Sequence, residues 1–284
     1  LSVTGDDAIT LNLLGEHLAV KLAVNSMVHN GVLKLDDKLN NYYPEYSGYG
    51  REHRTIRHLI DHSSGHGNSV TMQQDTNRIK NSRHVSSWQY RSNDASLKLL
   101  ILQKEPYLFG LNTKKQYGLL NDRLLGYLVE KVANSNLAEY IHSQVFAPLG
   151  LTSTRLEVNT QLEGGQLTPY QLTTTKHELL ILMQLLLNDG GYGDVTIWQQ
   201  PLMHASYGQR DGLFHCAPYL SDNIWYLELG NEFLLIDKQQ HLVIFRQLDA
   251  VEAIKNFDGA EPRNTCRMSS DAKSWLTELY IKSN

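Results

Sequence analysis

The sequence has little of several features that mark specialised classes of protein. Only two of its 284 residues, Cys216 and Cys266, are cysteines, which is too few for a disulfide framework. No apolar run approaches the ~18 residues that a membrane-spanning helix needs. The formal net charge is −4, so nucleic acid and anionic membranes are not expected as partners.

The first residues, LSVTGDDAIT, lack the basic region and apolar core of a secretory signal peptide. They are polar, and we expect them to be turn-like. The sequence contains no G-x-S-x-G elbow, Walker loop, G-x-G-x-x-G fingerprint or paired C-x-x-C motif. No cofactor or metal is therefore expected, and these features leave the compartment open.

What is present is the composition of a folded globular domain, with 41% hydrophobic and 20% charged residues. The chain is organised around residues 13–37. Apolar residues recur in its first part at three- and four-residue steps, which predicts a helix with a broad apolar face. Gly31, directly after Asn30, is expected to end the helix because glycine accepts a left-handed conformation. The apolar positions are Leu14, Leu18, Val20, Leu22, Val24, Met27 and Val28.

The segment after this glycine, VLKLDD at residues 32–37, resembles the G-K-L-x-L-D-D turn that follows the nucleophile helix of serine β-lactamases and penicillin-binding proteins. In that family the helix opens with S-x-x-K, roughly seventeen residues before the glycine. Counting back from Gly31 places the nucleophile position on Leu14 and the lysine position on His17. The helix therefore resembles the family's, but its serine and lysine are missing.

Two further segments resemble the class C β-lactamase, esterase and DD-peptidase branch of the family. Residues 54–65, RTIRHLIDHSSG, are close to its I-T-I-R-H-L-L-T-H-T-S-G segment. Residues 110–132 resemble P-G-x-x-x-x-Y-S-N-x-x-Y-x-L-L-G-x-I-I-E, which places the catalytic tyrosine on Tyr117. Gly118 and Leu119 replace the Ser and Asn of that motif, and a leucine side chain makes no hydrogen bond. Tyr117 is thus the one retained catalytic position.

The C-terminal third is expected to carry the third catalytic motif, K-T-G or its equivalent. Residues 223–237 and 242–246 are predicted to form two antiparallel strands joined at 238–240. They resemble the family's G-G-Q-x-x-x-V-D-P pattern, with Glu232 at the position of the Gln. The K-T-G positions then fall near 226–228, where the sequence YLE offers no Lys, Arg or Gly.

The resemblance implies the α/β fold of serine β-lactamases, in which helices flank an antiparallel sheet and a helical lobe stands beside it. We expect a single domain over residues 1–284, with the helical lobe at roughly 68–185 inserted between the two parts of the α/β lobe. Because only residues 1–12 precede the central helix, the N-terminal elements are expected to be missing or shortened. A member of this family would act in the periplasm or outside the cell.

Two other site chemistries compete for the segment 54–65. Residues 61–64, Asp-His-Ser-Ser, place acid, base and nucleophile side by side, but triads are normally assembled from distant segments. His58, His62 and His66 recur at four-residue spacing and could hold zinc on a helix, but Gly65 is expected to break that helix. We therefore expect turn and surface histidines here.

The single literal S-x-x-K stands at Ser270–Lys273. It opens a predicted helix over residues 271–281, where serine is the usual N-cap, and the family places no nucleophile there. We interpret it as a cap.

An acyl-enzyme route needs a nucleophile and a base within hydrogen-bond reach, and removing the nucleophile costs ~10⁶ in turnover. The leading hypothesis is therefore a pseudoenzyme of the serine-hydrolase family whose inter-lobe cleft binds a peptide, glycan or protein partner. The alternative is an active esterase, amidase or DD-peptidase-like hydrolase whose nucleophile lies elsewhere in the chain. The sequence leaves the ligand and the oligomeric state open.

Overall fold

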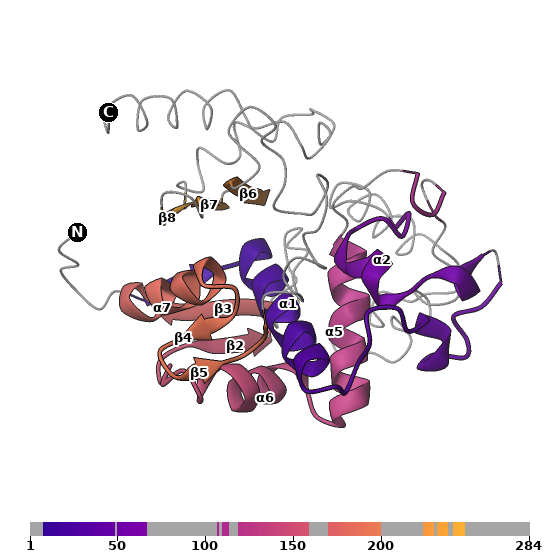
Figure 1. The fold of residues 1–284 in the computed structure, drawn as a ribbon, viewed down its shortest axis with the longest axis horizontal. Helices are drawn as coiled ribbons and strands as arrows, with labels where there is room; N and C mark the ends of the chain where they lie inside the picture. Colours follow the sequence, from indigo (N-terminus) through magenta and orange to yellow (C-terminus); the bar gives the residue numbers. More distant parts are fainter. Residues whose placement is uncertain are drawn as a thin grey trace.

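The central element of the computed structural model is helix α1 (Leu13–His29), which passes between a sheet on one side and helix α5 (Leu119–Ala133) on the other (Figure 1). This confirms the predicted helix almost to the residue. Gly31 has φ +71°, as a glycine directly after a helix typically does. The structure describes residues 8–48, 50–66, 107, 110–113, 119–158, 170–199, 224–229, 232–237 and 241–247.

The first sheet is antiparallel, with strand order β1-β3-β2, and packs against α1. Its strands are β1 (Ala8–Leu11), β2 (Arg155–Val158) and β3 (Tyr170–Thr175). The expectation that residues 1–10 are turn-like is wrong at 8–10, because β1 pairs along its whole length with β3 and buries Leu11 completely. Residues 1–7 lie outside the described part of the chain.

The second sheet is an antiparallel meander of β6 (Ile224–Leu229), β7 (Glu232–Asp237) and β8 (Leu242–Gln247). Two strands were predicted here, and the structure has three. Leu229 pairs with Glu232, which leaves two residues, Gly230 and Asn231, to connect β6 to β7. A Gly-Asn pair between apolar runs is a typical two-residue hairpin sequence, so the signal was present.

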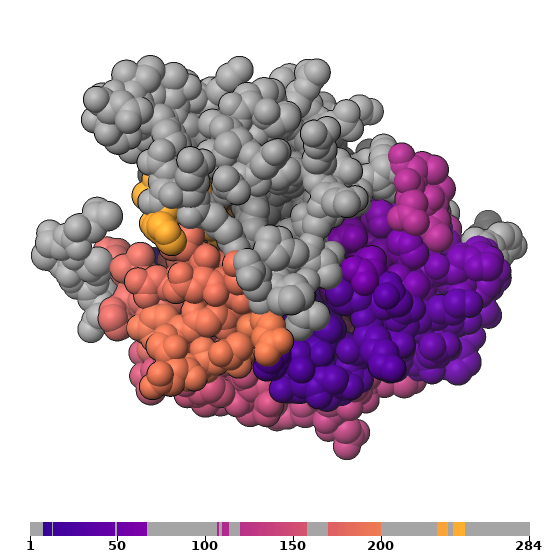
Figure 2. Space-filling view, viewed as in Figure 1, coloured from indigo at the N-terminus to yellow at the C-terminus, as the bar shows by residue number. Residues whose placement is uncertain are grey.

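The remaining elements cover this framework. They are the helices α2 (Ile56–Ile60), α6 (Leu137–Ile141) and α7 (Lys176–Leu187), the short 3₁₀ helices at Leu39–Asn41 and Arg51–His53, a π-helical turn at His142–Phe146, and the hairpin β4 (Gly191–Tyr192) and β5 (Val195–Thr196). In space-filling view, the orange surface of residues 170–199 lies on one side of the visible face, and the purple surface of the segment that ends at residue 66 lies on the other (Figure 2). None of the helices within the described ranges is both long and apolar enough to cross a bilayer.

Helix α1 is buried on all sides, not only on its predicted apolar face. Its polar residues Glu16, His17, Lys21 and Asn25 are each at most 3% exposed. Buried polar groups need hydrogen-bond partners inside the protein, because leaving them unpaired costs free energy. The partners of these side chains define the candidate site.

Candidate functional site

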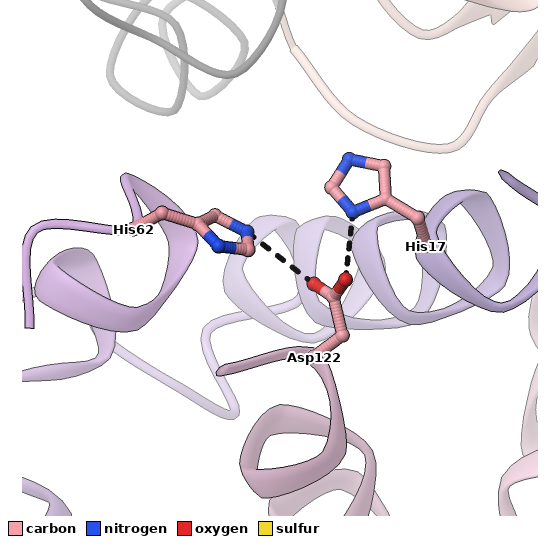
Figure 3. A group of neighbouring side chains, drawn as sticks. All are labelled: His17, His62 and Asp122. Atoms are coloured by element: carbon pink, nitrogen blue, oxygen red, sulfur yellow. Dashed lines mark hydrogen bonds and ion pairs between the residues drawn. The ribbon is translucent and has the colours of Figure 1, made fainter. Parts of the chain in front are cut away.

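Three side chains from separate elements converge in the interior: His17 from α1, His62 from the turn after α2, and Asp122 from the first turn of α5 (Figure 3). Nδ1 of His17 lies 2.9 Å from Oδ2 of Asp122, and Nε2 of His62 lies 3.5 Å from Oδ1 of the same carboxylate. All three side chains are at most 1% exposed. The carboxylate is therefore held between two imidazoles.

The electrostatics of this cluster follow from burial. Burial lowers the pKa of His62 to about 4 and also lowers the pKa of His17, although Asp122 acts against both shifts. Burial alone would raise the pKa of Asp122, but the two imidazoles outweigh it and hold that pKa well below its usual range. These directions favour the negative charge on Asp122 and make both imidazoles less basic than usual.

His62 occupies an unusual backbone conformation. It follows the end of α2 with φ +51°, in the left-handed region where glycine is normally found after a helix. For a non-glycine residue this conformation costs about 1–2 kcal/mol. The turn is fixed by the hydrogen bond from the Ser63 N–H to the His58 carbonyl, at 2.9 Å. The fold therefore holds the His62 imidazole in place despite a backbone cost.

Asn121 links His62 to Ser64. Its Nδ2 lies 3.2 Å from Nδ1 of His62, while its Oδ1 accepts the Ser64 hydroxyl at 2.5 Å. The backbone N–H of His66 donates to the Ser64 hydroxyl oxygen at 3.2 Å. Ser64 and Asn121 are completely buried. Residues 61–64 therefore do not form the local triad considered above. The Ser64 hydroxyl donates to the Asn121 amide oxygen, and the His62 imidazole faces the Asp122 carboxylate on α5.

The regularly spaced histidines do not form one site. Nδ1 of His58 accepts the Thr55 N–H at 2.9 Å, which completes a capping box at the start of α2. Nε2 of His66 lies 2.8 Å from the Tyr46 hydroxyl. The group of possible metal ligands found among the described residues consists of His17, His62 and Asp122. It contains His62 but neither His58 nor His66. The expectation of surface histidines is wrong for His62 and His66, which are 1% and 0% exposed.

Leu14, which the family resemblance places at the nucleophile position, is completely buried near the start of α1. Its backbone N–H donates to Oε2 of Glu232 at 2.9 Å, and the backbone N–H of Asn12 donates to Oε1 at 2.7 Å. A carboxylate there satisfies N–H groups that a helix start leaves free and complements the helix dipole. Burial raises the pKa of Glu232, and these two N–H groups oppose the rise.

Lys21 lies one turn beyond His17 on α1 and is 3% exposed. Its ammonium donates to the carbonyl oxygen of Ile60 at the end of α2. Burial lowers the pKa of Lys21 to about 8, against the attraction of Asp122 and Asp61. The site therefore has an internal cation close to its carboxylate.

The remaining predicted positions are only partly reached by the structure. Tyr117 lies outside the described residues, so its role stays a prediction, and so does the reading of Ser270–Lys273 as a cap. Leu119, which the resemblance aligns with the family's Asn, begins α5. Residues 226–228 lie on β6, and both β6 and β7 contact α1.

Asp122 was missed in the sequence, although a signal for it exists. Leu125 and Val129 follow Asp122 at helical spacing and are completely buried, so the acid stands on the apolar face of α5. An acid within an apolar helical face is expected to be paired in the interior. The sequence does not indicate its partners, because His17 and His62 lie 105 and 60 positions before Asp122.

The β-lactamase family model matches residues 20–193, more than half of the chain. The chain belongs to the β-lactamase family. Its fold is shared with a D-stereospecific amidohydrolase from Streptomyces (14% identity, TM-score 0.60, covering 91% of this chain and 88% of that one). A penicillin-binding protein from Bacillus halodurans is similar as well (15% identity, TM-score 0.58, covering 88% and 86%). The predicted α/β fold of serine β-lactamases is confirmed.

Among curated proteins, the "Putative D-alanyl-D-alanine carboxypeptidase" of Escherichia coli (strain K12) is 23% identical over 228 aligned positions, which cover 63% of this chain and 50% of the relative. The corresponding protein of Salmonella agona (strain SL483) is 20% identical and covered to 51%. The chain thus spans about half the length of the curated relatives that it matches.

Proposed function

We propose that this member of the β-lactamase family no longer carries out acyl transfer, and that its inter-lobe cleft binds a peptide, glycan or protein partner. The observation that carries the proposal is the environment of Leu14. The nucleophile position holds a completely buried side chain with no heteroatom, and its backbone N–H is engaged by the Glu232 carboxylate.

The contact with Glu232 also bears on transition-state stabilisation. Acyl transfer passes through an oxyanion that backbone N–H groups stabilise, and the N–H of the nucleophilic residue itself is a common donor. Here that donor, on Leu14, points at an acidic side chain. An oxyanion at the same place would have to compete with Glu232 for the N–H and, where the acid is ionised, would be repelled by it.

The residue at the position of the catalytic base also has another partner. His17, at the position of the catalytic lysine, pairs with Asp122 instead of facing a hydroxyl of the preceding turn. Ser63 and Ser64 are 2% and 0% exposed, which argues against either as the misplaced nucleophile of an active hydrolase. These contacts favour the inactive form of the proposal over the alternative of an esterase, amidase or DD-peptidase-like enzyme.

Intact hydrogen bonds in the segments around the site support a retained binding role. The segment around α2 keeps its capping box, and the Arg54 guanidinium donates from Nε to the Ser64 carbonyl at 2.7 Å. Glu178 accepts the backbone N–H groups of Thr152 and Ser153, both at 2.9 Å. A dispensable fold would be expected to lose such contacts together with its catalytic groups. We therefore infer that the fold is kept for recognition.

The experiment is a pair of measurements on the purified chain. Hydrolysis of simple acyl esters, penicillins and D-Ala-D-Ala peptides is expected to stay at the level of buffer. Calorimetric titration with D-Ala-D-Ala peptides, peptidoglycan fragments and chitooligosaccharides then tests binding. Turnover above buffer would contradict the loss of acyl transfer, while no heat with any of these ligands would remove peptides and glycans from the proposed partners.

A further inference from the structure

We propose that His17, His62 and Asp122 bind a divalent transition metal ion of the Zn²⁺ class in the interior of the fold. Two imidazole nitrogens and one carboxylate oxygen form a donor set that suits Zn²⁺ and Fe²⁺, and it leaves a coordination position open for water or a ligand. The candidate ligand atoms all lie within 4.8 Å of one another. This inference is independent of the loss of acyl transfer.

The separations of the ligand atoms fit a small ion. Metal–ligand bonds of about 2.0–2.1 Å in a tetrahedral site place neighbouring ligand atoms roughly 3.3 Å apart. The two nitrogen–oxygen separations are 2.9 Å, from His17 Nδ1 to Asp122 Oδ2, and 3.5 Å, from His62 Nε2 to Asp122 Oδ1, and all the ligand atoms lie within 4.8 Å of one another. An ion would take the place of the two ring protons that face the carboxylate, and each ring would carry its proton on the other nitrogen. Small movements suffice because both imidazoles already face the same carboxylate (Figure 3).

Asn121 can support His62 in either state. With Nε2 on a metal, Nδ1 of His62 carries the proton and needs an acceptor. Turning the Asn121 amide through half a rotation presents Oδ1 to that proton and Nδ2 to the Ser64 hydroxyl oxygen, so both existing contacts are kept. A ligating histidine whose second nitrogen is held in this way is the usual arrangement at protein metal sites.

The backbone around His62 gives an independent reason to look for a ligand. Its left-handed φ of +51° is a cost that asparagine or glycine would largely avoid. Conformations of this kind persist where the surrounding structure holds them in place, and they concentrate at functional sites. The other two ligands stand on the long helices α1 and α5, which contact each other and hold them at fixed positions.

One group opposes the site. The buried ammonium of Lys21 interacts unfavourably with the protonated forms of both imidazoles, and it would repel a metal ion for the same reason. The repulsion provides a test, because removal of the Lys21 charge should change the affinity for the metal ion. Replacement of Lys21 by Met, which removes the charge and keeps most of the side-chain volume, is expected to tighten metal binding by about tenfold or more.

The test is a titration of the chelator-treated full chain with Co²⁺, followed by displacement with Zn²⁺. We expect one equivalent of Co²⁺ to bind, visible absorption bands of a nitrogen- and oxygen-ligated ion, and a rise in the unfolding temperature. The bands are expected to lack the intense near-ultraviolet absorption of a thiolate, which separates this site from one built on Cys216 or Cys266. Asp122→Asn and His62→Asn are each expected to weaken binding at least about tenfold, in line with the loss of one ligand.

The matched control is His66→Asn. His66 is as deeply buried as His62 and comes from the same turn, but its imidazole faces Tyr46. Far-ultraviolet circular dichroism of each variant verifies folding, and the wild-type titration stands alone if Asp122→Asn does not fold. The proposal is overturned if the wild-type chain binds no equivalent of Co²⁺, if Asp122→Asn and His62→Asn bind as tightly as His66→Asn, or if Lys21→Met leaves the affinity unchanged.

Discussion

Oε2 of Glu232 accepts the backbone N–H of Leu14 at 2.9 Å, across 218 positions of sequence. This contact joins the start of the central helix to strand β7. If Leu14 stands at the nucleophile position, as the family resemblance implies, the acid occupies a backbone N–H that acyl transfer would need free. Under the proposed loss of acyl transfer, the apolar Leu14 side chain and the occupied backbone N–H would both disable the same site.

The first prediction follows from that pairing. Leu14→Ser supplies a hydroxyl at position 14. It leaves the backbone N–H of that residue bonded to Glu232, and it leaves His17 paired with Asp122. We expect no hydrolysis of acyl esters above the wild-type level, measured by release of a chromogenic alcohol. The double variant Leu14→Ser/Glu232→Gln is expected to stay inactive too, because His17 pairs with Asp122 and does not replace the family's catalytic lysine as the base. Activity in the single variant would show that base and oxyanion donors are intact.

A second prediction concerns the packing of α1 on β3. A Cβ added at Gly15 would lie 2.8 Å from the Leu172 Cβ and 2.9 Å from the Leu11 Cβ, which is too close for real contacts. Gly15→Ala is therefore expected to lower the free energy of unfolding by about 1–3 kcal/mol.

Gly126 on α5 provides the matched control for that substitution. A Cβ there would lie 3.5 Å from Leu137 and 3.6 Å from Val20, in ordinary contact. Gly126→Ala is expected to be neutral or to stabilise by up to about 1 kcal/mol, the helix-propensity difference between the two residues. Urea unfolding of both variants is the measurement, and equal effects at the two sites would contradict the tight contact at Gly15.

The third prediction is a pH dependence at Glu178. Burial alone would raise the pKa of this carboxyl, but hydrogen bonds from the Thr154 hydroxyl and the backbone N–H groups of Ser153 and Thr152 outweigh it and lower the pKa. A carboxyl whose pKa is lower in the folded state stabilises the fold above its unfolded pKa. That stability is lost as the pH falls through the folded pKa.

Glu178→Gln should therefore be less stable than wild type at neutral pH, by about 1–3 kcal/mol, since a buried donor loses its charged acceptor. The difference should begin to shrink as the pH falls below about 4.3, the usual pKa of an unfolded Glu. It should be smallest below the lowered folded pKa, where the wild-type carboxyl is neutral. Thermal unfolding at several pH values measures it. Glu157→Gln, at a half-exposed position on β2, is the control, with an expected change within about 0.5 kcal/mol. A stability difference at Glu178 that does not vary with pH would contradict the account.

The sequence was most informative where its signals are local. The helix at 13–29 follows from apolar spacing and a terminal glycine, and the family resemblance then assigns Leu14 and His17 to the positions of the missing catalytic residues. The sequence also holds a signal for the separation of β6, which ends at Leu229, from β7, which begins at Glu232, because a Gly-Asn pair between apolar runs favours a hairpin.

The site itself depends on contacts that no local pattern contains. His62 was recognised only as one of several nearby histidines, because the spacing of these residues does not say which imidazole faces the interior. Its partner Asp122 comes from another helix, and Glu232 reaches the start of α1 from a strand near the other end of the chain. Such contacts are set by tertiary packing, which periodicity and spacing do not encode.

The most direct measurement is covalent labelling with a fluorophosphonate probe, read by intact-protein mass spectrometry and peptide mapping. The proposed loss of acyl transfer predicts no stoichiometric adduct on the folded chain, at concentrations that label an active serine hydrolase completely. A one-to-one adduct on any serine, whether Ser26, Ser63, Ser64 or Ser270, would contradict the account and identify the nucleophile.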